Sequence, residues 1–310
     1  MHRLTSDHPI PAPFRNGVVA LGNFDGFHLG HQAVVARARA IARAEGRPLI
    51  VATFDPHPVR YFRPDAPPFR LTTLDQRERL FAAAGADAML VFGFDAALAA
   101  VSARSFITDW LGTRVGAACI VTGADFTFGA GKSGNAALLA DPAVMATIRS
   151  EAVGPVTDAA GPISSSRIRV ALQSGDPQEA ARLLTRPFTI EAVVQHGDKI
   201  GRTIGYPTAN MDMGKYLRPA YGIYAVRGHL PDGRVLDGVA NLGIRPQFTP
   251  PKELLEPHFF NFGGDLYGQR IEVALIAHLR PEARFDGLDA LVAQMDRDSA
   301  AARRILATIS

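Results

Sequence analysis

The pattern of apolar residues changes once along this chain of 310 residues, close to Pro187. Before that point short apolar runs, such as 18–21 and 49–54, alternate with segments of helical spacing. After it, strand-like runs follow one another directly. Strands separated by helices are typical of a parallel, doubly wound α/β sheet, whereas consecutive short strands are typical of an all-β fold. We therefore expect an α/β domain over residues 1–185 and a mainly β domain over residues 186–310.

The second half carries further signals of a small closed barrel. Asp232 and Gly233 lie between two strand-like runs, where an Asp-Gly pair favours a tight hairpin turn. Short strands joined in this way are typical of small barrels. A terminal amphipathic helix is predicted over residues 288–305. The strand-like runs are 189–194, 222–227, 235–241 and 270–279.

Composition narrows the classes of function. The formal net charge is +3 and the basic residues are scattered rather than gathered in one tract, so we expect no nucleic-acid partner. No stretch approaches about 18 uninterrupted apolar residues, so we expect no membrane partner. The single cysteine, Cys119, cannot form an internal disulfide, which favours a cytoplasmic protein with a buried structural thiol over a nucleophilic one. A weak homo-oligomer stays open.

A segment rich in glycine and histidine joins the first predicted strand to the first predicted helix. Glycine lets a backbone approach a ligand closely, and the amino end of a helix offers N–H groups and a positive dipole to phosphate. His28 and His31 are three residues apart, so on a helical turn they share a face. Two imidazoles there can donate to phosphate oxygens that gain charge during attack at the α-phosphorus. The segment consists of Gly22, Asn23, Phe24, Asp25, Gly26, Phe27, His28, Leu29, Gly30 and His31.

Two other interpretations of the histidine pair stay open at this point. His-x-x-His forms half of a metal site, although no thiol or carboxylate cluster at suitable spacing completes it. The pair would also suit a plain surface turn. Residues 28–31 nevertheless match the His-x-Gly-His signature in full, and their place after a first strand resembles the nucleotidyltransferase superfamily.

Three further segments resemble the adenylyltransferase half of the prokaryotic bifunctional flavin-synthesis enzymes. They are 53–58, 123–129 and 163–169. The resemblance implies a Rossmann-like domain in which Arg167 clamps the β- and γ-phosphates of ATP as pyrophosphate leaves. The alternatives are a plain serine helix cap with a solvated Arg167, and packing of Phe126 and Phe128 in the core. The resemblance implies ATP contacts at Gly22, Asn23, Phe24, Asp25, Gly26, Gly30, Ser164 and Ser165, and flavin contacts at His57, Asp125, Phe126 and Phe128.

Residues 197–210 resemble the riboflavin kinase signature, in which a glycine-rich loop precedes Pro-Thr-Ala-Asn. The backbone amides of such a loop can cradle phosphates. Thr208 offers a hydroxyl and Asn210 a carbonyl oxygen, and Mg²⁺ prefers such hard oxygen ligands. A glycine-rich hairpin with a Pro-Thr turn is the alternative. The implied phosphate-binding residues are Gly197, Lys199, Gly201, Arg202 and Gly205.

Later segments of the second half continue the same resemblance; they are 238–246, 255–258 and 264–268. By analogy, Glu256 is the general base that takes the proton from the riboflavin 5′-hydroxyl, and Arg245 binds the flavin. Phosphoryl transfer mostly needs positioning and charge neutralisation, so one carboxylate, one Mg²⁺ and a glycine loop suffice. An ordinary surface carboxylate is the alternative for Glu256.

Two departures from the family pattern bear on the kinase rate. Gln247 stands where the family often has Thr, and the segment that contains Asn261 stands where it often has Asp. Neither change removes the implied base or metal ligands.

The resemblance spans about residues 17–305 and implies two activities that share ATP as co-substrate. Riboflavin and ATP would give FMN and ADP in the second domain, and FMN and ATP would give FAD and pyrophosphate in the first. An enzyme with one degenerate half is a rival hypothesis. A flavin-binding regulator or a nucleic-acid binder that keeps both folds without turnover is another.

Overall fold

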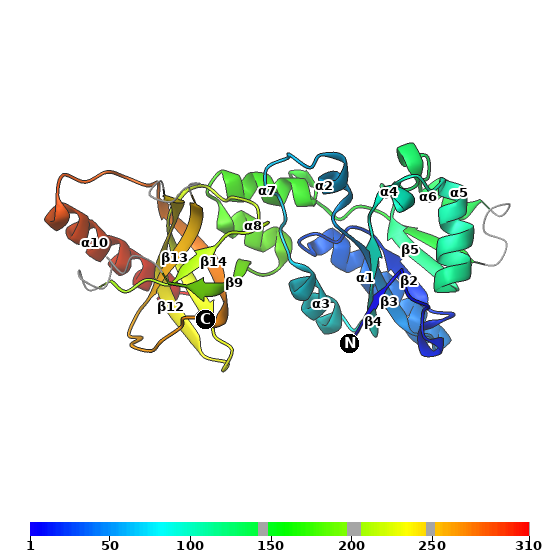
Figure 1. Cartoon of the computed structure of the whole chain (residues 1–310), viewed down its shortest axis with the longest axis horizontal. Coiled ribbons are helices and arrows are strands. Elements are labelled where there is room, and N and C mark those ends of the chain that lie inside the picture. Colours follow the sequence, from blue (N-terminus) through cyan, green and yellow to red (C-terminus); the bar gives the residue numbers. More distant parts are fainter. Residues whose placement is uncertain (142–147, 197–205, 246–251, 310) are drawn as a thin grey trace. The chain divides into compact units, whose positions relative to one another are not determined.

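Each half of the chain has its own fold in a computed structural model that describes residues 1–141, 148–196, 206–245 and 252–309 (Figure 1). Internal contacts divide the chain into two compact units. The first unit consists of Met1–Pro67 and Thr72–Ser164, and the second consists of Pro68–Leu71 and Ser165–Ser310. The short segment Pro68–Leu71 therefore belongs to the second unit by its contacts, although residues of the first unit flank it in the sequence.

A six-stranded sheet forms the centre of the first unit. Its strands are β1 (His2–Thr5), β2 (Val18–Leu21), β3 (Leu49–Asp55), β4 (Ala88–Gly93), β5 (Cys119–Gly123) and β6 (Arg149–Val153), and a separate antiparallel pair is formed by β7 (Thr157–Asp158) and β8 (Gly161–Pro162). The order is β1-β4-β3-β2-β5-β6, and every neighbouring pair is parallel. This confirms the predicted parallel, doubly wound sheet. The inner strands β2 and β3 are almost wholly buried, which explains their continuous apolar sequences.

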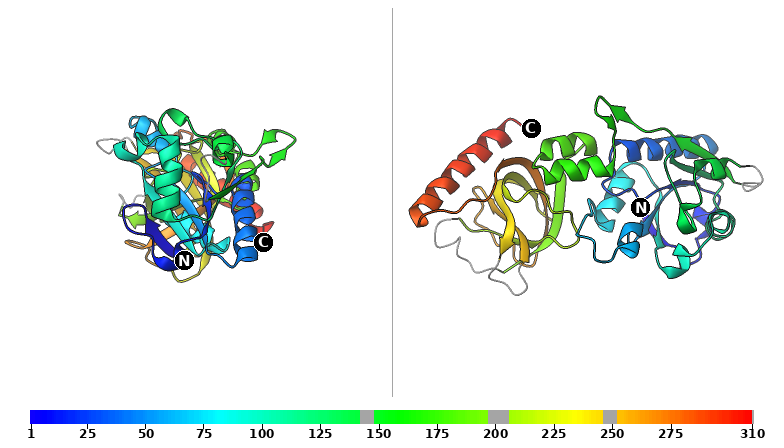
Figure 2. Two further views of the ribbon diagram at one scale, coloured as in Figure 1. Left: turned by 90° about the vertical axis from the view of Figure 1, so that its right-hand side faces the viewer. Right: turned by 90° about the horizontal axis from the view of Figure 1, so that it is seen from above.

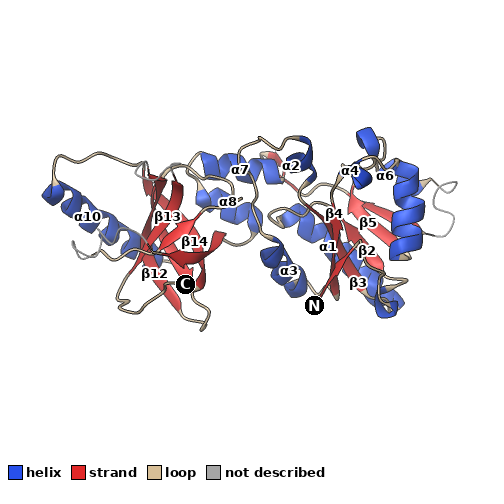
Figure 3. Cartoon of the chain, in the orientation of Figure 1, coloured by secondary structure: helices blue, strands red, loops and turns tan. Residues whose placement is uncertain are grey.

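Helices accompany the strands of the first unit (Figure 3). They are α1 (Leu29–Glu45), α2 (Pro58–Phe62), α3 (Leu74–Ala83), α4 (Ala96–Ala99), α5 (Ala103–Ser105) and α6 (Ala136–Ala140), with 3-10 turns at Ala12–Phe14 and Ala130–Lys132 and a π-helix at Phe106–Val115. Successive residues of β2 enter different cores, because side chains alternate along a strand. Val19 packs in one core with Phe106 of the π-helix, and Val18 packs in the other with Val34 of α1. The sheet is therefore covered on both faces.

Cys119 lies buried on β5, and burial raises the pKa of its thiol. A thiol with a raised pKa is a poor nucleophile, which agrees with a structural role. Among the described residues, no helix combines the length and the apolar character needed to cross a membrane.

The second unit is built around a closed antiparallel barrel. Its strands are β9 (Phe188–Gln195), β10 (Asn210–Asp212), β11 (Gly222–His229), β12 (Val235–Arg245), β13 (Lys252–Phe259) and β14 (Arg270–Arg280). They pair in the closed order β10-β13-β12-β11-β14-β9, which confirms the predicted barrel. A turn that contains Gly233 at φ 87° joins β11 to β12, as the Asp-Gly pair predicted. Strands β10 and β13 were not predicted.

Helices and one short segment complete the second unit (Figure 2). The helices are α7 (Ser165–Gln173), α8 (Pro177–Leu184) and α10 (Leu288–Ala307). Helix α10, predicted over 288–305, packs on β11, β12 and β14. Helix α8 begins after Asp176, whose side chain accepts a hydrogen bond from the Glu179 N–H at 2.9 Å.

The segment Pro68–Leu71 is bound to the second unit through its backbone. The Arg70 N–H donates to the Lys215 carbonyl at 3.2 Å, and the Leu217 N–H donates to the Arg70 carbonyl at 2.8 Å. Arg169 of α7 donates to the Phe69 carbonyl at 2.9 Å, and its guanidinium lies 5.3 Å from the centre of the Phe69 ring.

Candidate active sites

The turn between β2 and α1 has an unusual backbone. Phe24, Gly26 and Phe27 have φ values of 48°, 86° and 49°. Such values are costly for residues that carry a side chain, so they persist only where the surroundings hold them. The Phe24 and Phe27 rings are buried and pack against Phe81, with ring centroids 5.7 and 5.1 Å away. Burial of two aromatic rings offsets the backbone cost.

Polar contacts hold the same turn from the interior. One carboxylate oxygen of Asp25 accepts hydrogen bonds from the Thr72 N–H at 3.0 Å and the Thr72 hydroxyl at 3.3 Å. The Gly26 N–H donates to the Thr72 hydroxyl at 3.0 Å. Asp25 is 3% exposed, and its side chain lies in the protein interior. Only the backbone of Asp25, and not its carboxylate, is therefore in a position to contact a ligand.

His28 and His31 stack on one another at the amino end of α1. Their ring centroids are 3.7 Å apart at an interplanar angle of 22°. Nδ1 of His28 accepts the His31 backbone N–H at 3.4 Å, so His28 caps the helix. The predicted common face of the pair is confirmed. Within the described ranges, no group of three His, Cys, Asp or Glu side chains is arranged to hold a metal ion.

The packing around the pair leaves little room for a side chain at Gly30. A Cβ atom at this position would lie 3.1 Å from the His28 ring and 3.4 Å from the Ile163 carbonyl oxygen. Ile163 precedes Ser164 directly, so the chain that carries Ser164 passes beside the first turn of α1.

The predicted arginine Arg167 lies on α7 and forms an ion pair. Its Nη2 lies 3.1 Å from Oε1 of Glu179 on α8. Glu179 also pairs with Arg182 at 2.7 Å, and the hydrogen bond from Arg182, helped by the one from Arg167, lowers the pKa of the Glu179 carboxyl. Ser165 is the first residue of the same helix.

The predicted flavin residues of the first unit differ in burial. Phe128 is 7% exposed and packs against Phe106, and Phe126 stacks on Phe128 with centroids 5.9 Å apart. Asp125 lies in the same loop after β5. His57 is half-buried and caps α2, where its Nδ1 accepts the Val59 N–H at 3.2 Å.

An exposed aromatic group next to His57 was missed by the sequence reasoning. Phe62 is 64% exposed, and its ring lies 5.2 Å from Tyr61 and 5.8 Å from Phe94. A large exposed ring beside other rings is a surface on which a flat ligand can stack. The signal in the sequence was the Tyr61-Phe62 pair, which comes two residues after segment 53–58.

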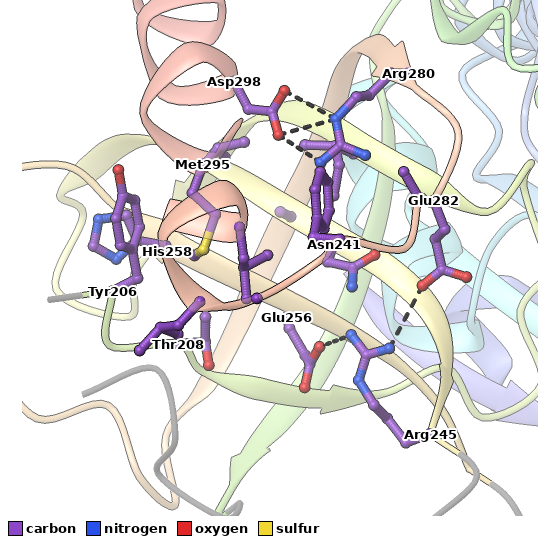
Figure 4. Close-up of a pocket in the computed structure, with 18 residues that line it drawn as sticks. Tyr206, Thr208, Asn241, Arg245, Glu256, His258, Arg280, Glu282, Met295 and Asp298 are labelled. Carbon is purple, nitrogen blue, oxygen red and sulfur yellow. Dashed lines mark hydrogen bonds and ion pairs between the residues drawn. The ribbon is translucent and has the colours of Figure 1, made fainter. Parts of the chain in front are cut away.

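The second unit contains a cavity of about 700 Å³ between the barrel and α10 (Figure 4). This volume lies within the range of ordinary small-molecule sites. Its lining combines apolar side chains with polar and charged ones. The lining includes Tyr206, Thr208, Ile223, Val239, Asn241, Arg245, Glu256, His258, Glu282, Phe285, Leu291 and Met295.

Glu256 stands on β13 opposite Asn241 of β12. Its carboxylate forms an ion pair with Arg245, and Nη1 of Arg245 lies 3.5 Å from Oε1 of Glu282 (Figure 4). Burial alone would lower the pKa of the Arg245 guanidinium, but the hydrogen bond and charge of Glu256 raise it overall. The sequence-predicted residues Glu256 and Arg245 are therefore in contact, and both line the cavity.

Asn241 is a further cavity residue that sequence reasoning did not single out. Its side-chain oxygen is buried and has no hydrogen-bond partner among the described residues. A buried acceptor without a partner is costly, so a ligand donor is its natural complement. The signal was an Asn within the apolar run 238–242, where nothing in the strand pattern calls for it.

A partly buried ion pair connects α10 to the barrel beside the cavity. Arg280 of β14 binds Asp298 through Nη2 to Oδ2 at 2.7 Å and Nε to Oδ1 at 3.0 Å. Gln294 donates to the same carboxylate at 2.8 Å. The pair connects the helix to the barrel, and both of its residues line the cavity.

A second cavity, of about 480 Å³, meets the first at Thr208, which lines both. Gly263, Gly264 and Asp265 form part of its wall. Asn210 follows on β10 and pairs with Gln195 of β9. The predicted residues Gly197, Lys199, Gly201, Arg202 and Gly205 lie outside the described residues, as does Gln247.

Asn261, the second departure from the family pattern, adopts a φ of 55° in the turn after β13. Asn tolerates this left-handed conformation better than most residues, so the substitution suits the local backbone.

Comparison with known proteins agrees with both halves. The model of the FAD synthetase family matches residues 11–167, and the model of the riboflavin kinase family matches residues 184–306. A bifunctional riboflavin kinase/FMN adenylyltransferase of Escherichia coli K12 is 38% identical over 292 residues, covering 94% of this chain and 93% of its own. A protein of the same name from Bacillus subtilis is 36% identical and covers 100% of this chain and 98% of its own.

One solved structure extends the likeness to the fold of the whole chain. It is a Streptococcus pneumoniae protein named as a macrolide-efflux protein, with a TM-score of 0.87 and 31% sequence identity, covering 98% of this chain and 99% of its own. Its name describes that protein, whereas both family models and the bifunctional relatives describe flavin chemistry. The sequence-predicted pair of activities is thereby confirmed. The chain belongs to the family of bifunctional riboflavin kinase/FMN adenylyltransferases, which make FMN from riboflavin and FAD from FMN.

Proposed function

We propose that phosphorylation of riboflavin takes place where the two cavities of the second unit meet. The larger cavity would hold the isoalloxazine ring among Val239, Leu291 and Met295, and the smaller would hold ATP. The observation that carries this assignment is that Thr208 lines both cavities, since a phosphoryl group must pass between two bound substrates.

Glu256 acts as the general base in this proposal. The 5′-hydroxyl oxygen of riboflavin attacks the γ-phosphorus of ATP, the bond to the bridging oxygen breaks, and the hydroxyl proton passes to the Glu256 carboxylate. The buried oxygen of Asn241 accepts a hydrogen bond from the flavin, and Arg245 contributes positive charge beside the base.

The hard oxygen ligands of Thr208, which lines both cavities, and of Asn210, two residues further along the chain, suit Mg²⁺. Thr208 and Asn210 would hold it with a hydroxyl and a carbonyl oxygen, and the ion would neutralise charge on the transferred phosphoryl group. Phosphate oxygens of ATP and water would complete the ligand set. This is the usual way in which proteins bind Mg²⁺ with nucleotides.

We propose that adenylylation of FMN takes place at the amino end of α1. The backbone of residues 22–26 and Gly30, with Ser164 and Ser165, would bind the phosphates of ATP at a helix terminus. An FMN phosphate oxygen attacks the α-phosphorus, and pyrophosphate leaves. His28 and His31 donate to the oxygens that gain charge, and Arg167 steadies the departing pyrophosphate.

The FMN ring would lie beside His57 and Asp125. Phe62 offers the exposed face for stacking, and Phe126 contributes from the loop after β5. Phe128 would support Phe126 from the core rather than touch the ring.

The functional division that we propose is an adenylyltransferase domain over 1–185 and a kinase domain over 186–310. The family models support it, because one ends at 167 and the other begins at 184. The contacts place residues 165–184 with the barrel. We also propose a cytoplasmic setting, with no nucleic-acid or membrane partner and at most weak self-association.

Filling the larger cavity tests the kinase assignment. Val239→Phe places a ring where the flavin would lie, so riboflavin binding and FMN formation should fail while the same protein still converts FMN to FAD. Val235→Phe, on the same strand but 53% exposed, is the matched control. Normal riboflavin phosphorylation in a folded Val239→Phe variant would refute the assignment.

A further inference from the structure

Arg77 is the largest side chain that the described part of the structure buries almost completely, with 1% exposed. Arginine usually keeps its charged end in water because transfer of a cation into the interior is costly. Arg77 lies on α3, outside every segment that the family resemblance singled out. A buried arginine at such a place therefore calls for an explanation.

The guanidinium of Arg77 reaches the carboxyl ends of two central strands. Its Nη1 donates to the hydroxyl of Thr53 at 2.7 Å and to the carbonyl of Asn23 at 3.2 Å. The Thr53 hydroxyl in turn donates to the same Asn23 carbonyl at 2.9 Å. Thr53 belongs to β3, and Asn23 begins the turn after β2. One nitrogen thus joins the ends of both strands at the start of the phosphate turn.

The amino end of α3 holds the rest of that turn. Thr73 caps the helix in a capping box with Gln76, which fixes where α3 begins. The residue before it, Thr72, binds the Asp25 carboxylate and the Gly26 N–H. Residues 72–77 therefore bind Asn23, Asp25 and Gly26, which belong to the turn with the unusual φ values.

Arg77 affects the phosphate turn through the orientation of the peptide group between Asn23 and Phe24. In a trans peptide the C=O and the following N–H point in opposite directions. The Asn23 carbonyl is held toward Arg77 and Thr53, so the Phe24 N–H points away from them. Release of that carbonyl would allow the peptide to rotate and would misdirect an amide at the start of the turn.

We infer that Arg77 is a positioning residue for ATP at the adenylyltransferase site. It fixes the Asn23 peptide and adds positive charge behind the phosphate turn. This inference rests on the proposed binding of ATP phosphates by residues 22–30. Since Arg77 acts through the turn, it should govern the affinity for ATP more than the affinity for FMN or the chemical step.

Two substitutions at Arg77 separate charge and hydrogen bonding from packing. Arg77→Met keeps much of the length, whereas Arg77→Lys keeps the charge and one donor. In steady-state FAD formation, Arg77→Met should raise the KM for ATP between about tenfold and a hundredfold, as expected for misplaced positioning groups. The KM for FMN and kcat should change by less than about threefold, and Arg77→Lys should recover part of the loss.

A second pair of variants covers the case in which Arg77→Met does not fold, as judged by circular dichroism and thermal melting. Thr53→Val removes the hydroxyl that links Arg77 to Asn23 and should raise the KM for ATP about threefold to tenfold. Thr122→Val is its matched control, because Thr122 is equally buried at the end of β5 and its hydroxyl has no partner among the described residues.

The outcomes separate the inference from the proposed function. An unchanged KM for ATP in folded Thr53→Val, or equal increases for Thr53→Val and Thr122→Val, would overturn the role of Arg77. Parallel increases in both KM values, or a loss of kcat alone, would also overturn it. If His28→Ala leaves FAD formation intact in the same assay, the proposed site itself is wrong.

Discussion

The two candidate active sites position their polar groups by different means. At the proposed adenylyltransferase site, the Asn23, Asp25 and Gly26 groups of the turn bind buried residues of the interior. At the proposed kinase site, charged side chains line the cavity itself, and Glu256 is paired with Arg245 within it. The first arrangement is fixed before substrate binds. In the second, a substrate that binds Glu256 or Arg245 would compete with the ion pair between them.

This difference explains where sensitivity to mutation should lie. A phosphate site made of backbone depends on residues that never touch the ligand, so distant buried groups matter. A site made of ion-paired side chains depends on the pairs themselves, because loss of one partner leaves the charge of the other uncompensated. Four predictions test this contrast.

The largest effect is expected at the proposed base. Glu256→Gln keeps the shape of the side chain but cannot accept the proton, so FMN formation should fall about a thousandfold. FAD formation from added FMN should remain at the wild-type rate, which makes the second activity the internal control. Chromatographic separation of riboflavin, FMN and FAD measures both. A kinase that retains its rate would remove Glu256 from this role.

The second-largest effect is expected on FAD formation, at the proposed adenylyltransferase site. His28→Ala should lower FAD formation about a hundredfold, because a donor to the developing charge is lost. FMN formation should persist in the same assay. The matched control is His8→Ala, since the His8 side chain is 78% exposed. If both activities fell together in a folded variant, the two sites could not be independent.

A smaller effect concerns the wall of the kinase cavity. Asp298→Asn removes the charge that pairs with Arg280, and because the pair is only partly buried this should lower the free energy of unfolding by about 2 kcal/mol. Urea unfolding can be followed by far-ultraviolet circular dichroism. Fluorescence of Trp110, the single tryptophan, reports on the first unit. We expect its transition to stay in place, and a shift in it would show that the mutation acts beyond the barrel.

The smallest effect is expected at a helix cap. Asp176→Ala removes the acceptor for the Glu179 N–H and should lower the free energy of unfolding by about 1 kcal/mol. Asp176→Asn retains an acceptor and should lose much less. Urea titration of both variants measures the difference, and equal losses would mean that the cap hydrogen bond contributes little.

The sequence predicted the first unit more fully than the second, for a physical reason. Strands β2 and β3 are buried on both faces, so their apolar runs are unmistakable. Strand β13 carries Glu256, Pro257 and His258, and these break the pattern on which strand prediction depends. The polar residues and the proline of β13 therefore prevented its prediction as a strand.

The candidate sites follow the same rule. His28 could be named because its type and its spacing from His31 point to chemistry, whereas Glu256 could be named only through the resemblance to riboflavin kinases. Arg77 could not, because a charged residue on an amphipathic helix normally faces solvent. The pairing of Glu256 with Arg245 could not be predicted either, since it depends on the register of β12 and β13.

The placement of Pro68–Leu71 has a consequence for how such a protein can be taken apart. The segment pairs with residues 215–217, although Thr72, the next residue, binds the turn that begins α1. No single cut of the polypeptide can therefore yield two intact modules. A fragment ending at residue 164 would contain Pro68–Leu71 without the residues to which this segment binds. A fragment beginning at residue 165 would lack the segment itself. Recombination of catalytic halves between relatives would have to exchange this insert along with the barrel.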